Sequence, residues 1–91
     1  MRLDLFLKAS RLCPRRSVAQ ELCDAGVVEV NGAPAKQSRT VREGDEITLR
    51  RPYRLTKVRV LSIPQTKQVA RHEASSLYEI LHDEELEVNW N

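Results

Sequence analysis

The dipeptide Asn31-Gly32 constrains the fold of this 91-residue chain more than any other feature. It directly follows the valine-rich run Val27–Val30, and Asn-Gly in that position is the strongest short signal for a two-residue β-hairpin turn. The chain must therefore reverse here, and residues 33–36 are predicted to return as a second strand. Because Pro34 lies in this return, the second strand should be at an edge of the sheet or irregular.

A first helix is predicted over residues 2–12, which contain no Gly or Pro. At 100° per residue, one sector of this helix forms a core face made of Leu3, Phe6, Leu7 and Ser10. A separate, narrow sector forms a polar stripe made of Asp4, Lys8 and Arg11.

A second helix is predicted to start near Pro14 and to end at Gly26. Its first residue stays open, because Pro14 suits a first turn and Ser17 suits an N-cap with Gln20 three residues on. In both cases two arginines and free backbone N–H groups converge, and a phosphate would satisfy them. The arginines are Arg15 and Arg16. The predicted inward face is Val18, Leu22 and Ala25, and the opposite face is Arg16, Gln20 and Asp24.

The rest of the chain is predicted to complete a single α+β domain. A turn at Glu43-Gly44-Asp45 precedes a strand over 46–50, and alternation over 57–60 marks another strand. Helical spacing then predicts a final helix that carries Ala74, Leu77, Tyr78 and Leu81 and frays at its acidic end. The expected fold is two N-terminal helices packed on a small antiparallel sheet, plus a C-terminal helix.

Charge divides this chain in two and indicates its partner. The first 71 residues hold all 15 Lys and Arg against 7 acidic residues, a formal charge of +8. The last 20 residues hold 6 acidic residues and no Lys or Arg, a formal −6. A compact body with this excess of cations favours a polyanionic partner, so we expect nucleic acid.

The cations form two groups along the chain. Lys8, Arg11, Arg15 and Arg16 cluster on the predicted helices and are the candidate contact to nucleic acid. Arg50, Arg51, Arg54, Lys57 and Arg59 form a second run, which an exposed strand face explains equally well. The four aromatic residues are scattered, which disfavours base stacking and favours backbone and shape recognition. Composition does not separate structured RNA from duplex DNA.

Several other classes of protein are disfavoured. The three glycines are spaced for turns, no base can be placed near a Ser or Cys, and His72 and His82 suit a solvated surface, so no catalysis and no cofactor are expected. Cys13 and Cys23 are ten residues apart and suit the core better than a metal site. The absence of an apolar stretch of membrane-spanning length and the two thiols indicate a reduced, cytoplasmic protein with no membrane contact.

The order of these elements resembles the S4-type RNA-binding domain over roughly the first 50 positions. The residues that carry the resemblance are Arg2-Leu3-Asp4, Leu7, Ser10-Arg11, Arg15-Arg16, Ala19, Gly26-Val27, Val30-Asn31-Gly32, Lys36 and Gly44-Asp45. The length, the basic strand and the segment Ser76–Leu81 are similar to the RqcP-type S4 proteins of bacterial ribosome-associated quality control, and to the small heat-shock S4 proteins.

This resemblance implies binding to large ribosomal subunits that are obstructed by peptidyl-tRNA. The RqcP-type branch supports C-terminal alanine tailing of stalled chains, alongside a factor that recruits alanyl-tRNA, whereas the heat-shock branch recycles large subunits. Arg2 and Arg16 are expected to contact ribosomal RNA near the tRNA, supported by Lys8, Arg11, Arg15, Lys36 and Arg39. Cys13-Pro14 departs from the polar or basic pair expected in relatives.

We expect a monomer in which residues 1–65 form the S4 RNA-binding domain and residues 66–91 a C-terminal helix and acidic tail. A rival interpretation is a protein-interaction module whose acidic helix docks a basic partner. A second rival, an RNA-modifying enzyme, would need a catalytic domain that 91 residues leave no room for.

Overall fold

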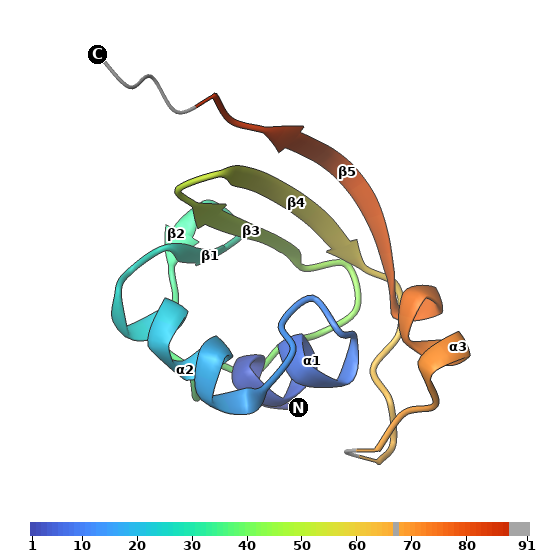
Figure 1. The fold of residues 1–91 in the computed structure, drawn as a ribbon. Coiled ribbons are helices and arrows are strands. Elements are labelled where there is room, and N and C mark those ends of the chain that lie inside the picture. The colour runs from blue at the N-terminus through green and yellow to red at the C-terminus, as the bar shows by residue number, and fades with distance from the viewer. Residues whose placement is uncertain (67, 88–91) are drawn as a thin grey trace.

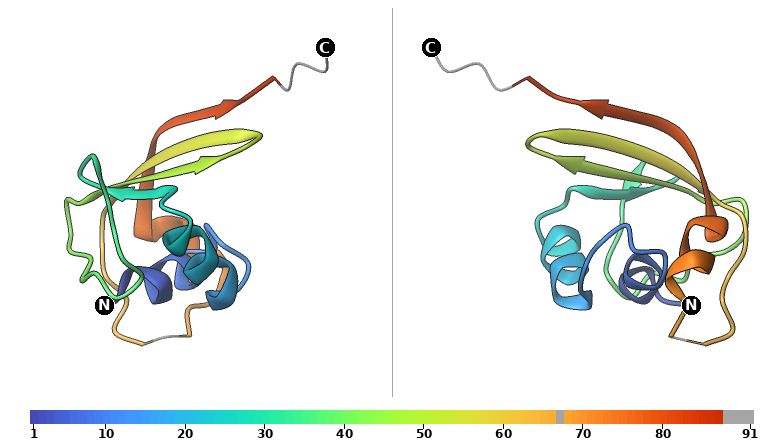
Figure 2. Two further views of the ribbon diagram at one scale, coloured as in Figure 1. Left: turned by 90° about the vertical axis from the view of Figure 1, so that its left-hand side faces the viewer. Right: turned by 45° about the vertical axis from the view of Figure 1, so that its right-hand side comes forward.

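The computed structural model describes residues 1–66 and 68–87. Its elements, in chain order, are α1 (Leu3–Ala9), α2 (Arg16–Asp24), β1 (Val28–Val30), β2 (Ala33–Pro34), β3 (Glu46–Arg51), β4 (Arg54–Val60), α3 (Arg71–Ala74), the 3₁₀ turn η1 (Ser75–Leu77) and β5 (Tyr78–Glu85). The strands form one antiparallel sheet in the order β2-β1-β3-β4-β5. Helices α1 and α2 lie side by side below one face of this sheet, so the predicted α+β class is confirmed (Figures 1 and 2). Within the described residues, no helix has the length and apolar character needed to cross a membrane.

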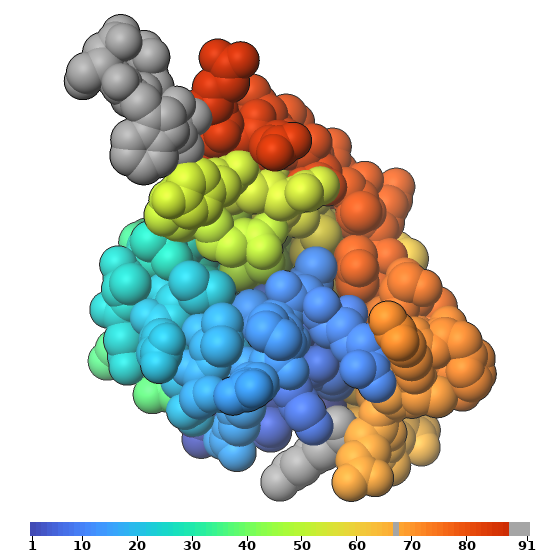
Figure 3. Space-filling view, in the orientation of Figure 1, coloured from blue at the N-terminus to red at the C-terminus, as the bar shows by residue number. Residues whose placement is uncertain are grey.

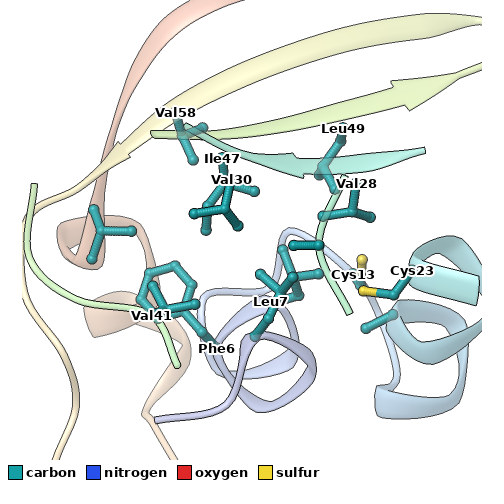
Figure 4. Packing of buried hydrophobic residues seen from close by; sticks show 14 of the residues in the cluster. Phe6, Leu7, Cys13, Cys23, Val28, Val30, Val41, Ile47, Leu49 and Val58 are labelled. Atoms are coloured by element: carbon teal, nitrogen blue, oxygen red, sulfur yellow. The ribbon is translucent and has the colours of Figure 1, made fainter. Parts of the chain in front are cut away.

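The hydrophobic core lies between the sheet and the two N-terminal helices (Figure 4). The predicted core face of α1 is confirmed, since Leu3, Phe6 and Leu7 are fully buried and Ser10 is buried beside them. Alternate residues of the strands meet this face, as expected for a sheet with one covered side. These strand residues are Val28, Val30, Ile47, Leu49, Val58 and Val60.

Both cysteines are part of this core. Cys13 and Cys23 are buried free thiols, which confirms their predicted place. Burial raises the pKa of Cys13, and burial together with neighbouring negative charge raises the pKa of Cys23 to about 11. At neutral pH both side chains are therefore protonated and behave as small apolar residues.

Helix α2 is rotated relative to the prediction. Ala19 and Cys23 are its fully buried residues, whereas Val18 and Leu22 are half-buried and Ala25 is exposed. The buried face of α2 is therefore shifted by about one residue from the predicted one, from Val18 and Leu22 to Ala19 and Cys23. The predicted outward face was wrong for Arg16 and Gln20, which donate to Asp4 of α1, and is confirmed for Asp24, which is exposed.

The C-terminal helix is much shorter than predicted. The spacing of Ala74, Leu77, Tyr78 and Leu81 indicated a helix through Leu81, but the chain is helical only to Leu77 and then forms β5. Ala74 and Leu77 are buried, whereas Tyr78 begins the strand that pairs with the otherwise open edge of β4, and Leu81 lies where the register of that pairing shifts. The predicted fraying was also wrong for residues 83–85, which belong to this strand; residues 88–91 lie outside the described part.

The hairpin at Asn31-Gly32 is confirmed in detail. Asn31 and Gly32 both have positive φ, at 53° and 85°, as a type I′ turn requires. Asn31 also connects this turn to the start of β3: its Oδ1 accepts from the backbone N–H of Glu46 at 3.0 Å and its Nδ2 donates to Asp45 at 3.1 Å. The turn therefore sets both the β1–β2 pairing and the entry of β3.

We expect Gly32→Val to destabilise the protein by about 1–3 kcal/mol, because a β-branched residue is strained at positive φ. Thermal unfolding should show a melting temperature lower by several degrees. Ala33→Val, in the neighbouring edge strand where valine is favoured, is the matched control and should leave the melting temperature nearly unchanged. Equal melting temperatures for the Gly32 variant and the wild type would contradict the turn.

Candidate nucleic-acid interface

The buried carboxylate of Asp4 organises the surface formed by the two N-terminal helices. Asp4 lies in the first turn of α1 and is fully buried. Its oxygens accept from Nε of Arg2 at 3.1 Å, from Nε of Arg16 at 3.0 Å and from Nε2 of Gln20 at 3.1 Å. The backbone N–H of Leu5 donates to the same carboxylate at 2.9 Å. One carboxylate thus joins the chain before α1 to the first two turns of α2.

This network keeps Asp4 ionised although it is buried. Burial alone would raise its pKa, but hydrogen bonds from Gln20, Arg16 and Arg2 outweigh burial and lower the pKa below the usual 3.8. Placing Asp4 on an exposed polar stripe with Lys8 was therefore wrong. The helical spacing correctly placed Asp4 and Lys8 in one sector of the helix. It could not show that α2 covers Asp4.

The two arginines that bind Asp4 remain half-exposed. Their side chains are 43% exposed for Arg2 and 41% for Arg16, so each guanidinium is held on one side and faces solvent on the other. Because a guanidinium has five N–H donors, these bonds to Asp4 leave donors for an external acceptor. The carboxylate therefore fixes the direction of two cations without removing them from the surface.

The loop between β2 and β3 brings further cations beside Arg2. Backbone N–H groups in the first turn of α1 donate to this loop, from Leu3 to the carbonyl of Arg39 at 2.8 Å and from Asp4 to that of Gln37 at 3.1 Å. Lys36 and Arg39 flank these contacts and are exposed. These two predicted contacts thus lie near the N-terminus of α1.

Arg15 and Arg16 mark the start of α2, which resolves the alternatives left open by the sequence. Arg15 is the N-cap residue, and its side chain does not cap the helix. Pro14 and Ser17 therefore flank the cap, and neither is the cap itself. Arg15 is exposed next to the half-buried Arg16, so the predicted convergence of two arginines at this helix start is present.

Lys8 and Arg11 come together at the other end of α1. The helix ends at Ala9, so Arg11 is not helical as predicted; its φ is 61°. Both side chains still line one hollow with residues 68 and 69. In the space-filling view, the surface of the N-terminal helices adjoins the segment that leads into α3 (Figure 3).

Four of the five cations in the second basic run bind carboxylates of the sheet, whereas Arg51 donates to the hydroxyl of Thr56. Lys57 and Arg59 bind Glu46 at 3.1 and 3.5 Å, and Arg59 also binds Glu79 at 3.5 Å. Arg50 binds Glu29 at 3.2 Å. The outer face of the sheet therefore carries a network of both signs and no excess of cations for phosphates.

The acidic strand β5 also pairs its carboxylates with cations of the sheet. Asp83 binds Arg54 through both oxygens, at 2.7 and 2.8 Å, and accepts from Thr56 at 3.1 Å. The hydrogen bonds from Arg54 are the main cause that lowers the pKa of Asp83 to about 2. The C-terminal carboxylates thus pair with cations of β4, whereas no carboxylate of the described residues lies within 4.0 Å of the cationic groups of Lys8, Arg11, Arg15, Lys36 or Arg39.

Comparisons with known proteins assign this chain to a protein family. The family model of the S4 domain matches residues 1–47, more than half of the chain. The chain belongs to the S4 domain family. It is 45% identical to the "RQC P-site tRNA stabilizing factor" of Halalkalibacterium halodurans, over 92% of this chain and 93% of that protein. Its identity to the Bacillus subtilis protein of the same name is 44%, over 94% of this chain and 98% of that one.

The solved structure of heat shock protein 15 from Vibrio cholerae is also similar. Its TM-score is 0.79 at 34% sequence identity, over 88% of this chain and 80% of that one, and that protein is described as trimeric. The relatives of this chain therefore include both groups of S4 proteins that its sequence resembles, which confirms the resemblance.

The S4 match contains the whole Asp4 network and all seven predicted contact residues. They are Arg2, Lys8, Arg11, Arg15, Arg16, Lys36 and Arg39. The paired cations of β4 and the acidic strand β5 lie beyond it. The predicted contact residues therefore all belong to the S4 part of the chain.

Sequence reasoning missed Asp4 and Gln20 as part of this site. One signal was present: Asp4 is the only acidic residue among the first 20, where it lies between apolar residues and shares the segment with five cations. A single carboxylate among apolar residues and several cations indicates a buried ion-pair partner of those cations rather than a solvated surface charge.

We expect Asp4→Asn to destabilise the protein by about 2–3 kcal/mol, because the hydrogen bonds to a charged acceptor are lost. The loss stays within this range because Arg2 and Arg16 are half-exposed and can still be solvated. Thermal unfolding at neutral pH measures this loss. Asp24→Asn removes the same charge from an exposed position of α2 and is the control, with little expected effect.

The same pair of proteins tests the pKa of Asp4. A carboxyl whose pKa is lower in the folded state stabilises the protein above its unfolded value, near 4, and loses this effect as the pH falls through the folded pKa. The difference in melting temperature between wild type and Asp4→Asn should therefore be constant from pH 5 to 8 and shrink below about pH 4. A difference that persists unchanged at pH 2 would contradict the ionised, bonded state.

Proposed function

We propose that this chain is a non-catalytic RNA-binding protein of bacterial ribosome-associated quality control. In this proposal it binds large ribosomal subunits in the cytoplasm, as a monomer, and contacts both ribosomal RNA and the P-site peptidyl-tRNA. The observation that carries the proposal is the sorting of charge: cations on the helices and the β2–β3 loop face solvent, whereas those on the outer face of the sheet are paired. The two relatives from Halalkalibacterium halodurans and Bacillus subtilis, both named as P-site tRNA stabilizing factors, support this choice of partner.

Arg2 and Arg16 are proposed as the central contacts, with Lys8, Arg11, Arg15, Lys36 and Arg39 around them. Guanidiniums suit phosphates because two parallel N–H donors match two phosphate oxygens. Asp4 acts as a positioning residue that holds both arginines in one orientation, so little side-chain freedom is lost when RNA binds. The proposed readout is therefore of backbone and shape.

The proposal extends to C-terminal alanine tailing of the stalled nascent chain, together with a factor that recruits alanyl-tRNA. A chain that holds peptidyl-tRNA in the P site would keep the nascent peptide available for each added alanine. The likeness to heat shock protein 15 favours a second candidate, recycling of large subunits that still carry nascent chains.

A sedimentation assay with purified bacterial large subunits tests the partner. The protein should co-sediment with subunits that carry P-site peptidyl-tRNA more strongly than with vacant subunits. Adding the alanyl-tRNA-recruiting factor and alanyl-tRNA should then lengthen the peptide only when this chain is present. Binding without lengthening, accompanied by release of the subunits, would favour recycling, and no binding to either subunit would contradict the proposal.

Arg16→Ala should weaken subunit binding by about 1.5–3 kcal/mol, roughly 10- to 100-fold, because a charge-assisted contact is lost. Arg59→Ala removes the same charge from the outer face of the sheet and should weaken binding far less. Because Arg16 also donates to Asp4, its removal should cost some stability as well.

Arg16→Lys separates these two effects. Lysine keeps a positive charge beside Asp4 but lacks the guanidinium fork, so binding should fall while the melting temperature changes less than in Arg16→Ala. Equal losses of subunit binding for the Arg16 and Arg59 variants would overturn the assignment of the interface.

A further inference from the structure

A hollow separates the end of α1 from the segment that leads into α3. Its volume is about 310 Å³, and its walls are formed by Lys8, Ala9, Arg11, Pro14, Gln68 and Val69. A hollow of this size is at the lower limit for small-ligand sites, with room for a phosphate and the sugar next to it.

The hollow carries positive charge that the protein does not compensate. Within residues 1–66 and 68–87, no carboxylate lies within 4.0 Å of the cationic groups of Lys8 or Arg11. The cations of β4, in contrast, are paired with carboxylates. Two cations and the side-chain amide of Gln68 around one concave space form a donor-rich site suited to an anion.

The backbone at Arg11 supports a binding role for this residue. Arg11 has a φ of 61°, a left-handed conformation that glycine and asparagine adopt more easily. Its N–H donates to the carbonyl of Lys8 at 3.0 Å, which closes the end of α1. The helix end would therefore be less strained with another residue, and strained positions of this kind cluster at functional sites.

We propose that this hollow binds one backbone phosphate of the RNA, between Lys8 and Arg11, with Gln68 donating to the same phosphate or its sugar. This inference rests on the proposed RNA-binding function and adds a discrete subsite to it. Gln68 and Val69 lie beyond the residues 1–47 that match the S4 domain. Val69 packs against the core, which fixes this wall in place. In this proposal the C-terminal segment converts a basic surface into a concave phosphate site that is open to solvent on one side.

A pair of glutamine variants tests the concave site against general electrostatics. Gln68→Glu places a carboxylate in the wall of the hollow, whereas Gln65→Glu adds the same charge three residues earlier, at an exposed position outside it. Binding to purified large subunits should weaken about 10-fold for Gln68→Glu and less than about 2-fold for Gln65→Glu. Equal weakening by the two variants would overturn the subsite.

Arg11→Asn tests the strained cation itself. Asparagine tolerates left-handed backbone, so the melting temperature should be unchanged or higher while subunit binding falls about 10-fold. The slope of log affinity against log salt should become shallower by about 0.7–0.9, the value for one lost phosphate contact. Arg50→Asn, on the outer face of the sheet, is the control and should leave affinity and slope nearly unchanged.

The outcomes separate this subsite from the function on which it rests. If Arg16→Ala abolishes subunit binding but Arg11→Asn and Gln68→Glu bind like the wild type, the RNA-binding function stands and the subsite is wrong. If the wild-type protein does not bind large subunits, the proposed function fails first. A lower melting temperature for Arg11→Asn would show that Arg11 serves the fold, which also contradicts the proposal.

Discussion

The surface of this protein depends on one buried carboxylate that must remain charged. Asp4 is fully buried, so its ionised form persists only because two arginines, a glutamine and a backbone N–H donate to it. The same bonds set the distance and rotation between α1 and α2. They also hold Arg2 and Arg16 with one side towards the protein and the other towards solvent. The bonds of Asp4 that stabilise the fold are therefore the same bonds that position the arginines proposed to contact RNA.

The distribution of ion pairs gives the two sides of the molecule different roles. On the sheet, Glu29, Glu46 and Asp83 together bind four of the five basic side chains of β3 and β4, so the field of these cations is largely compensated. On the helices and the β2–β3 loop, Asp4 is the carboxylate that binds cations, and it is buried beneath them. A phosphate backbone approaching the helices would meet uncompensated positive charge. The acidic strand β5, at the far edge of the sheet, would be turned away from it.

The sequence predicted the parts of the fold that local chemistry decides. Asn31-Gly32 specified a turn because few dipeptides accept positive φ at both positions, and the face of Leu3, Phe6 and Leu7 followed from helical spacing. Tyr78–Leu81 was predicted wrongly because its apolar spacing also fits a helix, and the open edge of β4, which no local pattern reveals, made it a strand. Asp4 was missed for the same reason: its burial depends on α2, twelve residues further along the chain. Clusters of cations were visible in the sequence, but their pairing with distant carboxylates was not.

An electron cryomicroscopy structure of the protein bound to a large ribosomal subunit with P-site tRNA would test the central claim most directly. The account predicts that Arg2 and Arg16 contact RNA phosphates while both remain bonded to Asp4. It also predicts that the outer face of the sheet, with Lys57 and Arg59 still paired to Glu46, points away from RNA. A complex in which the sheet faces the phosphates, or in which Asp4 releases both arginines, would contradict it.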